Sequence, residues 1–133
     1  LYTKYENKTH EYRIHLARSF YGNKFEPILI QRKIFQKSAG VERPLSWEVR
    51  NHKNGFVFVR NSGEPTPPEV LFVAEEFMNE HFPQIHFVAL DVIFHAKKKK
   101  AWVLEGNTAP GLEGNTIEVY KDYFKRLNSE KAA

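Results

Sequence analysis

The chain contains no cysteine, so disulfide bonds and thiolate metal sites of the zinc-finger kind are both excluded. It also lacks any apolar run approaching the roughly 18 residues that a membrane-spanning helix needs. No N-terminal segment has the charged, apolar and small-residue pattern of a signal peptide. These absences are typical of a cytoplasmic protein without a membrane partner, which is the localisation we expect.

The residues that are present suit one globular domain. Hydrophobic residues make up 41% of the 133 positions and charged residues 27%, so we expect residues 1–133 to form a single domain. The formal net charge is +4, and the most basic run is Lys97–Lys100. This run lies between two apolar segments, which is typical of a solvated hairpin tip. A contact with phosphate or another polyanion is the alternative.

Hydrophobic periodicity and turn residues predict strands and helices in a definite order. The expected strands span residues 11–20, 25–34, 86–95 and 101–107, and residues 47–51 and 55–60 form either two short strands or one strand with a broken middle. Pro27 places part of the second strand at an edge or a bulge, whereas 86–95 is apolar on both faces and therefore central. The expected helices span residues 68–82 and 116–128. This order predicts an α+β fold in which both helices pack on one face of a largely antiparallel sheet.

The pairing of 86–95 with 101–107 predicts a metal site. If an odd-numbered tip such as 97–99 joins the strands, Asp91 faces Glu105 and Ala89 faces Asn107, so the three polar side chains share one face. Two carboxylates held that close repel each other unless a cation neutralises them. Oxygen ligands without cysteine favour Mg²⁺ or Mn²⁺ over zinc. The alternative is that these acids are exposed strand residues without a chemical role, since an even tip would separate them.

Two segments resemble a known enzyme signature. ALDVIFH and VLEGNTAPGLEGNT are similar to the carboxy-terminal signature of the ATP-grasp carboxylate–amine ligases, in which a strand bearing Asp precedes a strand bearing Glu-x-Asn and a Pro-Gly loop. HEYRIHL and VRNHKNGFVF resemble segments of the branch related to ribosomal-protein glutamate ligase, which has bacterial and bacteriophage members. The resemblance extends from about residue 9 to residue 125, and the Glu-x-Asn-Thr-x-Pro-Gly run is its most specific part.

The resemblance implies an enzyme that joins a carboxylate to an amine with ATP and Mg²⁺ or Mn²⁺, through an acyl phosphate, releasing ADP and phosphate. Its substrates would be small-molecule or peptide carboxylates and amines. The residues that it assigns to the metal are Asp91, Glu105 and Asn107, of which Asn107 also approaches the nucleotide. Arg50 and Asn51 would contact the γ-phosphate or the acyl phosphate. Gly111 and the neighbouring backbone amides would receive the substrate carboxylate, next to the start of the last helix.

The sequence departs from this family pattern in two ways. Several members carry an arginine two residues before the metal-binding aspartate, where this chain has Ala89. Arg13 or Arg50 is the catalytic cation that we expect to replace it. The chain also shows no glycine-rich phosphate loop, no adenine-binding hinge and no amino-terminal lobe. We therefore expect a carboxy-terminal fragment, starting at Leu1, that is weak or inactive without its missing lobe.

Two other functions remain open at this point. A non-catalytic basic module would bind nucleic acid or another polyanion through Lys97–Lys100, and nucleic acid is an expected partner only in that case. A fragment that keeps the fold could instead act as an assembly surface and form a homo-oligomer.

Overall fold

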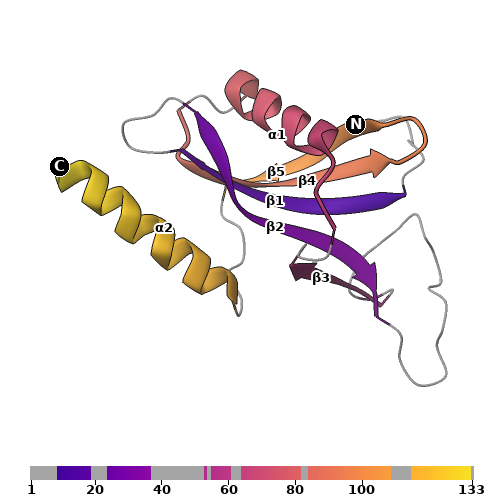
Figure 1. Ribbon diagram of the computed structural model, residues 1–133, viewed down its shortest axis with the longest axis horizontal. Coiled ribbons are helices and arrows are strands. Elements are labelled where there is room, and N and C mark those ends of the chain that lie inside the picture. The colour runs from indigo at the N-terminus through magenta and orange to yellow at the C-terminus, as the bar shows by residue number, and fades with distance from the viewer. Residues whose placement is uncertain are drawn as a thin grey trace.

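The computed structural model describes residues 9–18, 24–36, 53, 55–60, 64–81, 84–108 and 115–132. In this part of the chain, five strands form one sheet that is accompanied by two helices (Figure 1). The elements are β1 (His10–Arg18), β2 (Phe25–Phe35), β3 (Phe56–Arg60), α1 (Pro68–His81), β4 (Phe87–His95), β5 (Lys100–Asn107) and α2 (Asn115–Ala132). The α+β class predicted from the sequence is confirmed. Neither of these helices is long and apolar enough to cross a membrane.

The sheet has the strand order β3-β2-β1-β4-β5, and all neighbouring strands run antiparallel. The predicted hairpin of β1 with β2 is present, and β4 lies between β1 and β5, which confirms its predicted interior position. Predicted strand 47–51 lies outside the described residues. The register of β1 with β2 shifts by one residue close to Pro27, because Leu16 pairs with Pro27 whereas His15 pairs with Leu29. A bulge at this point agrees with the lack of an N–H donor on proline.

One face of the sheet forms the hydrophobic core with α1. Even-numbered side chains of β1 and β4 alternate onto this face, since successive strand residues point to opposite sides. The cluster consists of Tyr12, Ile14, Leu16, Phe25, Val70, Ala74, Met78, Val88, Leu90, Val92 and Phe94, all of them buried. The helical residues in it recur every four positions, so a single stripe of α1 faces the strands.

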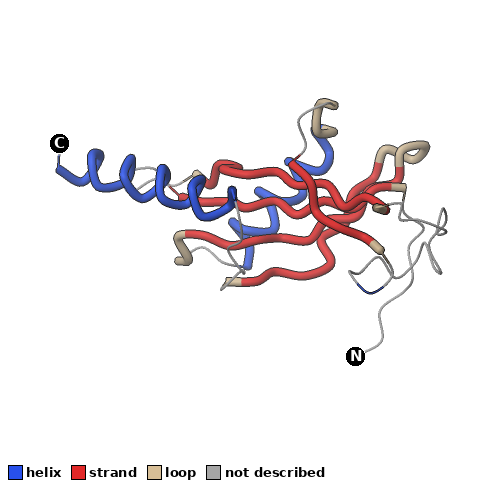
Figure 2. Tube along the Cα trace, turned by 90° about the horizontal axis from the view of Figure 1, so that it is seen from below, coloured by secondary structure: helices blue, strands red, loops and turns tan. Residues whose placement is uncertain are grey.

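The second helix packs on the other face of the sheet, so the prediction that both helices share one face is wrong. Tyr120 of α2 contacts the rings of His15 and Phe87, which are odd-numbered residues of β1 and β4. Figure 2 shows the sheet lying between the two helices. The periodicity of α2 predicts an apolar stripe but does not say which face of the sheet receives it. The odd-numbered face can accept α2 because it is aromatic and partly apolar near the end of β1.

Candidate functional site

A line of five side chains crosses the whole sheet on the face opposite α1. Direct cross-strand pairs join Arg60 to Gln31, Gln31 to Arg13, Arg13 to Asp91 and Asp91 to Glu105. Residues that pair directly point to the same side of a sheet. We call this set, one residue from each strand, the transverse row. Its two arginines lie toward β3 and its two carboxylates toward β5, so the charge changes sign across the sheet.

Arg13 and Asp91 are joined by two hydrogen bonds at the centre of the transverse row. Arg13 Nε donates to Asp91 Oδ1 at 2.9 Å, and Nη2 donates to Oδ2 at 3.3 Å. The Asp91 side chain keeps only 17% of its accessible surface. The guanidinium therefore supplies the cation that a half-buried carboxylate inside an apolar strand requires. Arg13 also lies over the Phe58 ring, 4.1 Å from its centre, which fixes the plane of the guanidinium.

Asp91 faces Glu105 as predicted, although the hairpin tip is not the odd-numbered one on which that prediction depended. His95 pairs with Lys100, so the tip contains the four residues from Ala96 to Lys99. A bulge at Leu104 corrects the register, because Val92 pairs with Val103 whereas Asp91 pairs with Glu105. Leu104, the additional residue of the bulge, is 55% exposed. The even-numbered hairpin tip and the bulge together keep Asp91 and Glu105 on one face of the sheet.

The metal ligands predicted from the sequence are thus brought to the same part of the sheet. Glu105 and Asn107 are exposed residues at the end of β5, and Asn107 pairs with Ala89, two residues before Asp91. Arg50, Asn51 and Gly111 lie outside the described residues. Arg13 is the one predicted catalytic cation whose position is described, and it contacts Asp91 directly.

The oxygen ligands at the β5 end of the transverse row suit a hard divalent cation. Asp91, Glu105 and Asn107 offer carboxylate and amide oxygens, which are the ligands that Mg²⁺ and Mn²⁺ prefer. Within the described part of the chain, no group of three or more acidic or histidine side chains converges on one point. Both oxygens of Asp91 accept from Arg13, so a metal there would have to share Asp91 with the guanidinium.

No protein-family model, curated protein or solved structure matches the chain. The resemblance to ATP-grasp ligases therefore stays a hypothesis that depends on the residues quoted for it. The transverse row stands independently of that resemblance, since it follows from the strand register alone.

A second ion pair adds a cation beside the transverse row. Lys33 Nζ lies 2.9 Å from Glu11 Oε1, and both side chains are largely buried. The same ammonium lies 4.8 Å from the centre of the Phe58 ring, on which Arg13 also stacks. One aromatic ring thus holds two cations of neighbouring strands in place. Because Glu11 compensates the Lys33 charge, this ion pair positions an ammonium on the face without adding net positive charge.

A buried chain of polar side chains connects α2 to the row. His15 is 1% exposed, and its Nδ1 lies 2.7 Å from the Tyr120 hydroxyl while its Nε2 lies 3.1 Å from Gln31 Oε1. An amide oxygen can only accept, so Nε2–H donates to Gln31 and the Tyr120 hydroxyl donates to Nδ1. Burial lowers the pKa of His15, against the smaller opposing effect of the Gln31 hydrogen bond. Burial also raises the pKa of Tyr120 to about 12. Both groups are therefore neutral near pH 7.

The sequence pattern does not indicate a functional role for several residues on or against this face, namely Glu11, Gln31, Lys33, Arg60 and, from α2, Tyr120. A signal was present for Glu11, since every second residue of HEYRIHL is polar. His15, on the same face, is also buried.

Proposed function

We propose that this chain carries the metal-binding and phosphate-binding face of a Mg²⁺-ATP-dependent carboxylate–amine ligase of the ATP-grasp type. The observation that carries the proposal is the direct pairing of Asp91 with Glu105 beside Arg13. The order of charge along the transverse row supports it, because phosphoryl transfer requires both metal-binding acids and cations that hold phosphate oxygens.

Each group has a role that follows from its chemistry. Asp91, Glu105 and Asn107 would hold Mg²⁺, which when bound neutralises charge on the nucleotide phosphates. Arg13 is fixed by Asp91 and Phe58, so it meets an incoming anion without first losing side-chain freedom. Arg13 lies opposite Asp91, two residues from Ala89, where the family arginine is missing, and we assign the missing charge to it.

Arg60 lies on the same face at β3, and its charge favours anionic oxygens farther from Asp91 and Glu105, whereas the charge of Lys33 is compensated by Glu11. Arg60 is exposed, so it can turn toward a ligand without breaking a buried contact. Acids at one end and cations at the other would orient a metal–phosphate ligand along the row. A ligand oriented in this way must carry phosphate groups as well as a metal ion, which favours a nucleotide over a divalent cation alone.

The proposed reaction has two steps. A substrate carboxylate oxygen attacks the γ-phosphorus of ATP, the bond from that phosphorus to the bridging oxygen breaks, and ADP leaves. The amine nitrogen then attacks the acyl carbon, phosphate leaves, and the nitrogen loses a proton. Arg13 would stabilise the negative charge that develops on the transferred phosphoryl group and on the acyl oxygen.

Saturation-transfer NMR with ATP tests this proposal on the chain itself. We expect ATP binding that requires Mg²⁺, that is lost in Glu105→Gln and that persists in Glu75→Gln. Both changed side chains are exposed, and Glu75 lies on α1 at the opposite face, so neither substitution should disturb the fold. Binding that is independent of Mg²⁺ and of Glu105, but is removed by neutralising Lys97–Lys100, would instead favour the polyanion function.

A further inference from the structure

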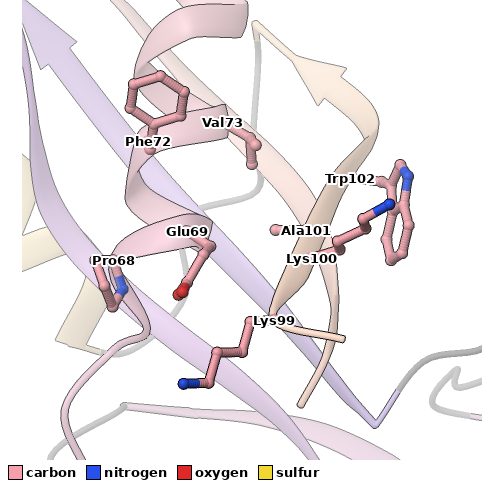
Figure 3. A pocket seen from close by; sticks show the side chains of 8 residues that line it. All are labelled: Pro68, Glu69, Phe72, Val73, Lys99, Lys100, Ala101 and Trp102. Carbon is pink, nitrogen blue, oxygen red and sulfur yellow. The ribbon is translucent and has the colours of Figure 1, made fainter. Parts of the chain in front are cut away.

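A groove of about 440 Å³ runs between α1 and the outer side of β5, away from the transverse row. Its lining is mainly apolar and consists of Pro68, Glu69, Phe72, Val73, Lys99, Lys100, Ala101 and Trp102. Figure 3 shows Phe72 and Val73 projecting from the helix above Ala101, with Glu69 and Lys99 at the lower mouth. Phe72 is 66% exposed although it is a large aromatic side chain.

The strand that borders this groove is the edge of the sheet. β5 pairs with β4 on one side and has no other strand beside it in the described part of the chain. An edge strand presents backbone N–H and C=O groups that an extended peptide can use by adding one more strand. The groove next to such an edge offers a place for alternate side chains of the added strand.

The charge around the groove favours an acidic occupant. Lys99 and Lys100 line it, and Lys97 and Lys98 are exposed on the same hairpin tip, whereas Glu69 is the one acid in the lining. The tip is held in shape by a hydrogen bond from the Lys98 backbone N–H to His95 Nδ1 at 3.2 Å. The lysine ammonium groups are therefore presented from a defined turn and not from a loose tail.

Lys99 has an unusual backbone conformation. Its φ is 51°, in the left-handed region that glycine adopts at much lower cost than lysine. Glycine would suit this position of the turn better for folding alone. At this position the Lys99 side chain lies at the mouth of the groove (Figure 3).

We propose that the groove between α1 and β5 binds an extended acidic peptide, which adds to the β5 edge, inserts an apolar side chain beside Phe72 and places carboxylates near Lys99 and Lys100. The edge strand, the groove and the lysines are separate from the transverse row, so this binding is independent of the proposed ligase activity.

Fluorescence anisotropy with a labelled peptide in which glutamate alternates with leucine tests this proposal on the full chain. We expect saturable binding that is weakened about tenfold by Phe72→Ala and about threefold by Lys99→Gln. Glu69→Gln should tighten binding, because it removes the like charge from the groove. The matched controls are Phe124→Ala and Lys121→Gln, exposed residues of α2 on the other face, which should leave the affinity unchanged.

Two further probes separate strand addition from simple charge attraction. A version of the peptide with N-methylated backbone nitrogens at alternate positions keeps every glutamate and leucine side chain but lacks those backbone donors, and it should bind at least about tenfold more weakly. Equal binding of the N-methylated peptide would overturn strand addition. The proposal would also be overturned by a lack of saturable binding, or by heparin and single-stranded DNA competing as well as the peptide while Phe72→Ala has no effect. Circular dichroism of each variant verifies that the fold is intact.

Discussion

Arg13 and Asp91 lie directly opposite each other on β1 and β4, and the guanidinium of Arg13 donates to both carboxylate oxygens of Asp91. This pair explains how an acid can occupy the middle of the apolar run FVALDVIFH without destabilising the sheet. It also places a cation and an acid of the candidate site in fixed positions before any ligand arrives.

We expect Arg13→Gln to lower the free energy of unfolding by about 1–2 kcal/mol, because the half-buried Asp91 carboxylate loses its cation. Urea denaturation measures this change. The double variant Arg13→Gln with Asp91→Asn should recover part of the loss, since no unpaired charge remains. A single-variant effect below about 0.3 kcal/mol would mean that solvent already satisfies Asp91.

The lowered pKa of His15 predicts a loss of stability in mild acid. The unfolded chain protonates His15 near its ordinary pKa of 6.5, whereas the folded state resists protonation until lower pH. Between the folded and unfolded pKa values of His15, the unfolded state therefore binds more protons than the folded state. The contribution of His15 to stability is complete above pH 6.5 and declines as pH falls toward the folded-state pKa. Urea denaturation between pH 5 and pH 7.5 should show a shallower pH slope for His15→Gln than for the unchanged chain. Parallel slopes would contradict the assignment.

Tyr120→Phe keeps the aromatic packing against Phe87 and removes the hydroxyl that donates to His15 Nδ1. We expect a loss of about 1–2 kcal/mol of stability at pH 7, because a buried ring nitrogen is left without its donor.

The raised pKa of Tyr120 also predicts a change in the stability of the fold at alkaline pH. Its contribution is complete below pH 10 and declines as pH rises toward about 12, since the unfolded tyrosine ionises first. The variant should lack this part of the alkaline decline, and an unchanged profile would argue against the buried hydrogen bond.

Lys99→Gly should stabilise the fold by about 0.5–1 kcal/mol, because glycine adopts the positive φ of this turn position without the clash of a Cβ atom. Thermal unfolding followed by circular dichroism measures the change. Lys98→Gly, at the neighbouring exposed position without a positive φ, is the control and should be neutral or destabilising. If both variants destabilise equally, Lys99 is not strained.

The sequence predicts the candidate site better than it predicts the layers around it. The facing of Asp91 and Glu105 follows from two apolar strands with acids at matching positions, but the bulge at Leu104 that maintains it has no sequence signal. Bulges depend on local backbone geometry, so counting residues from a hairpin tip gives the correct facing here only because two deviations cancel.

The wrong prediction that α2 packs on the same face of the sheet as α1 has a different physical cause. Glu11 and His15 are polar residues that alternate with apolar residues along β1, yet they are only 5% and 1% exposed. Their burial depends on Lys33, Gln31 and Tyr120, which come from other elements. A polar face that satisfies its own hydrogen bonds can be covered by a helix, and these partners become apparent only once the strand register is known.

Manganese titration of the ¹⁵N-labelled chain tests the central claim most directly, because Mn²⁺ broadens amide signals close to where it binds. The account predicts selective broadening around Asp91, Glu105 and Asn107, which is lost in Glu105→Gln and retained in Glu75→Gln. Broadening spread evenly over exposed acids such as Glu75 and Glu118, with none centred on the β4–β5 pair, would contradict a metal site at this end of the transverse row.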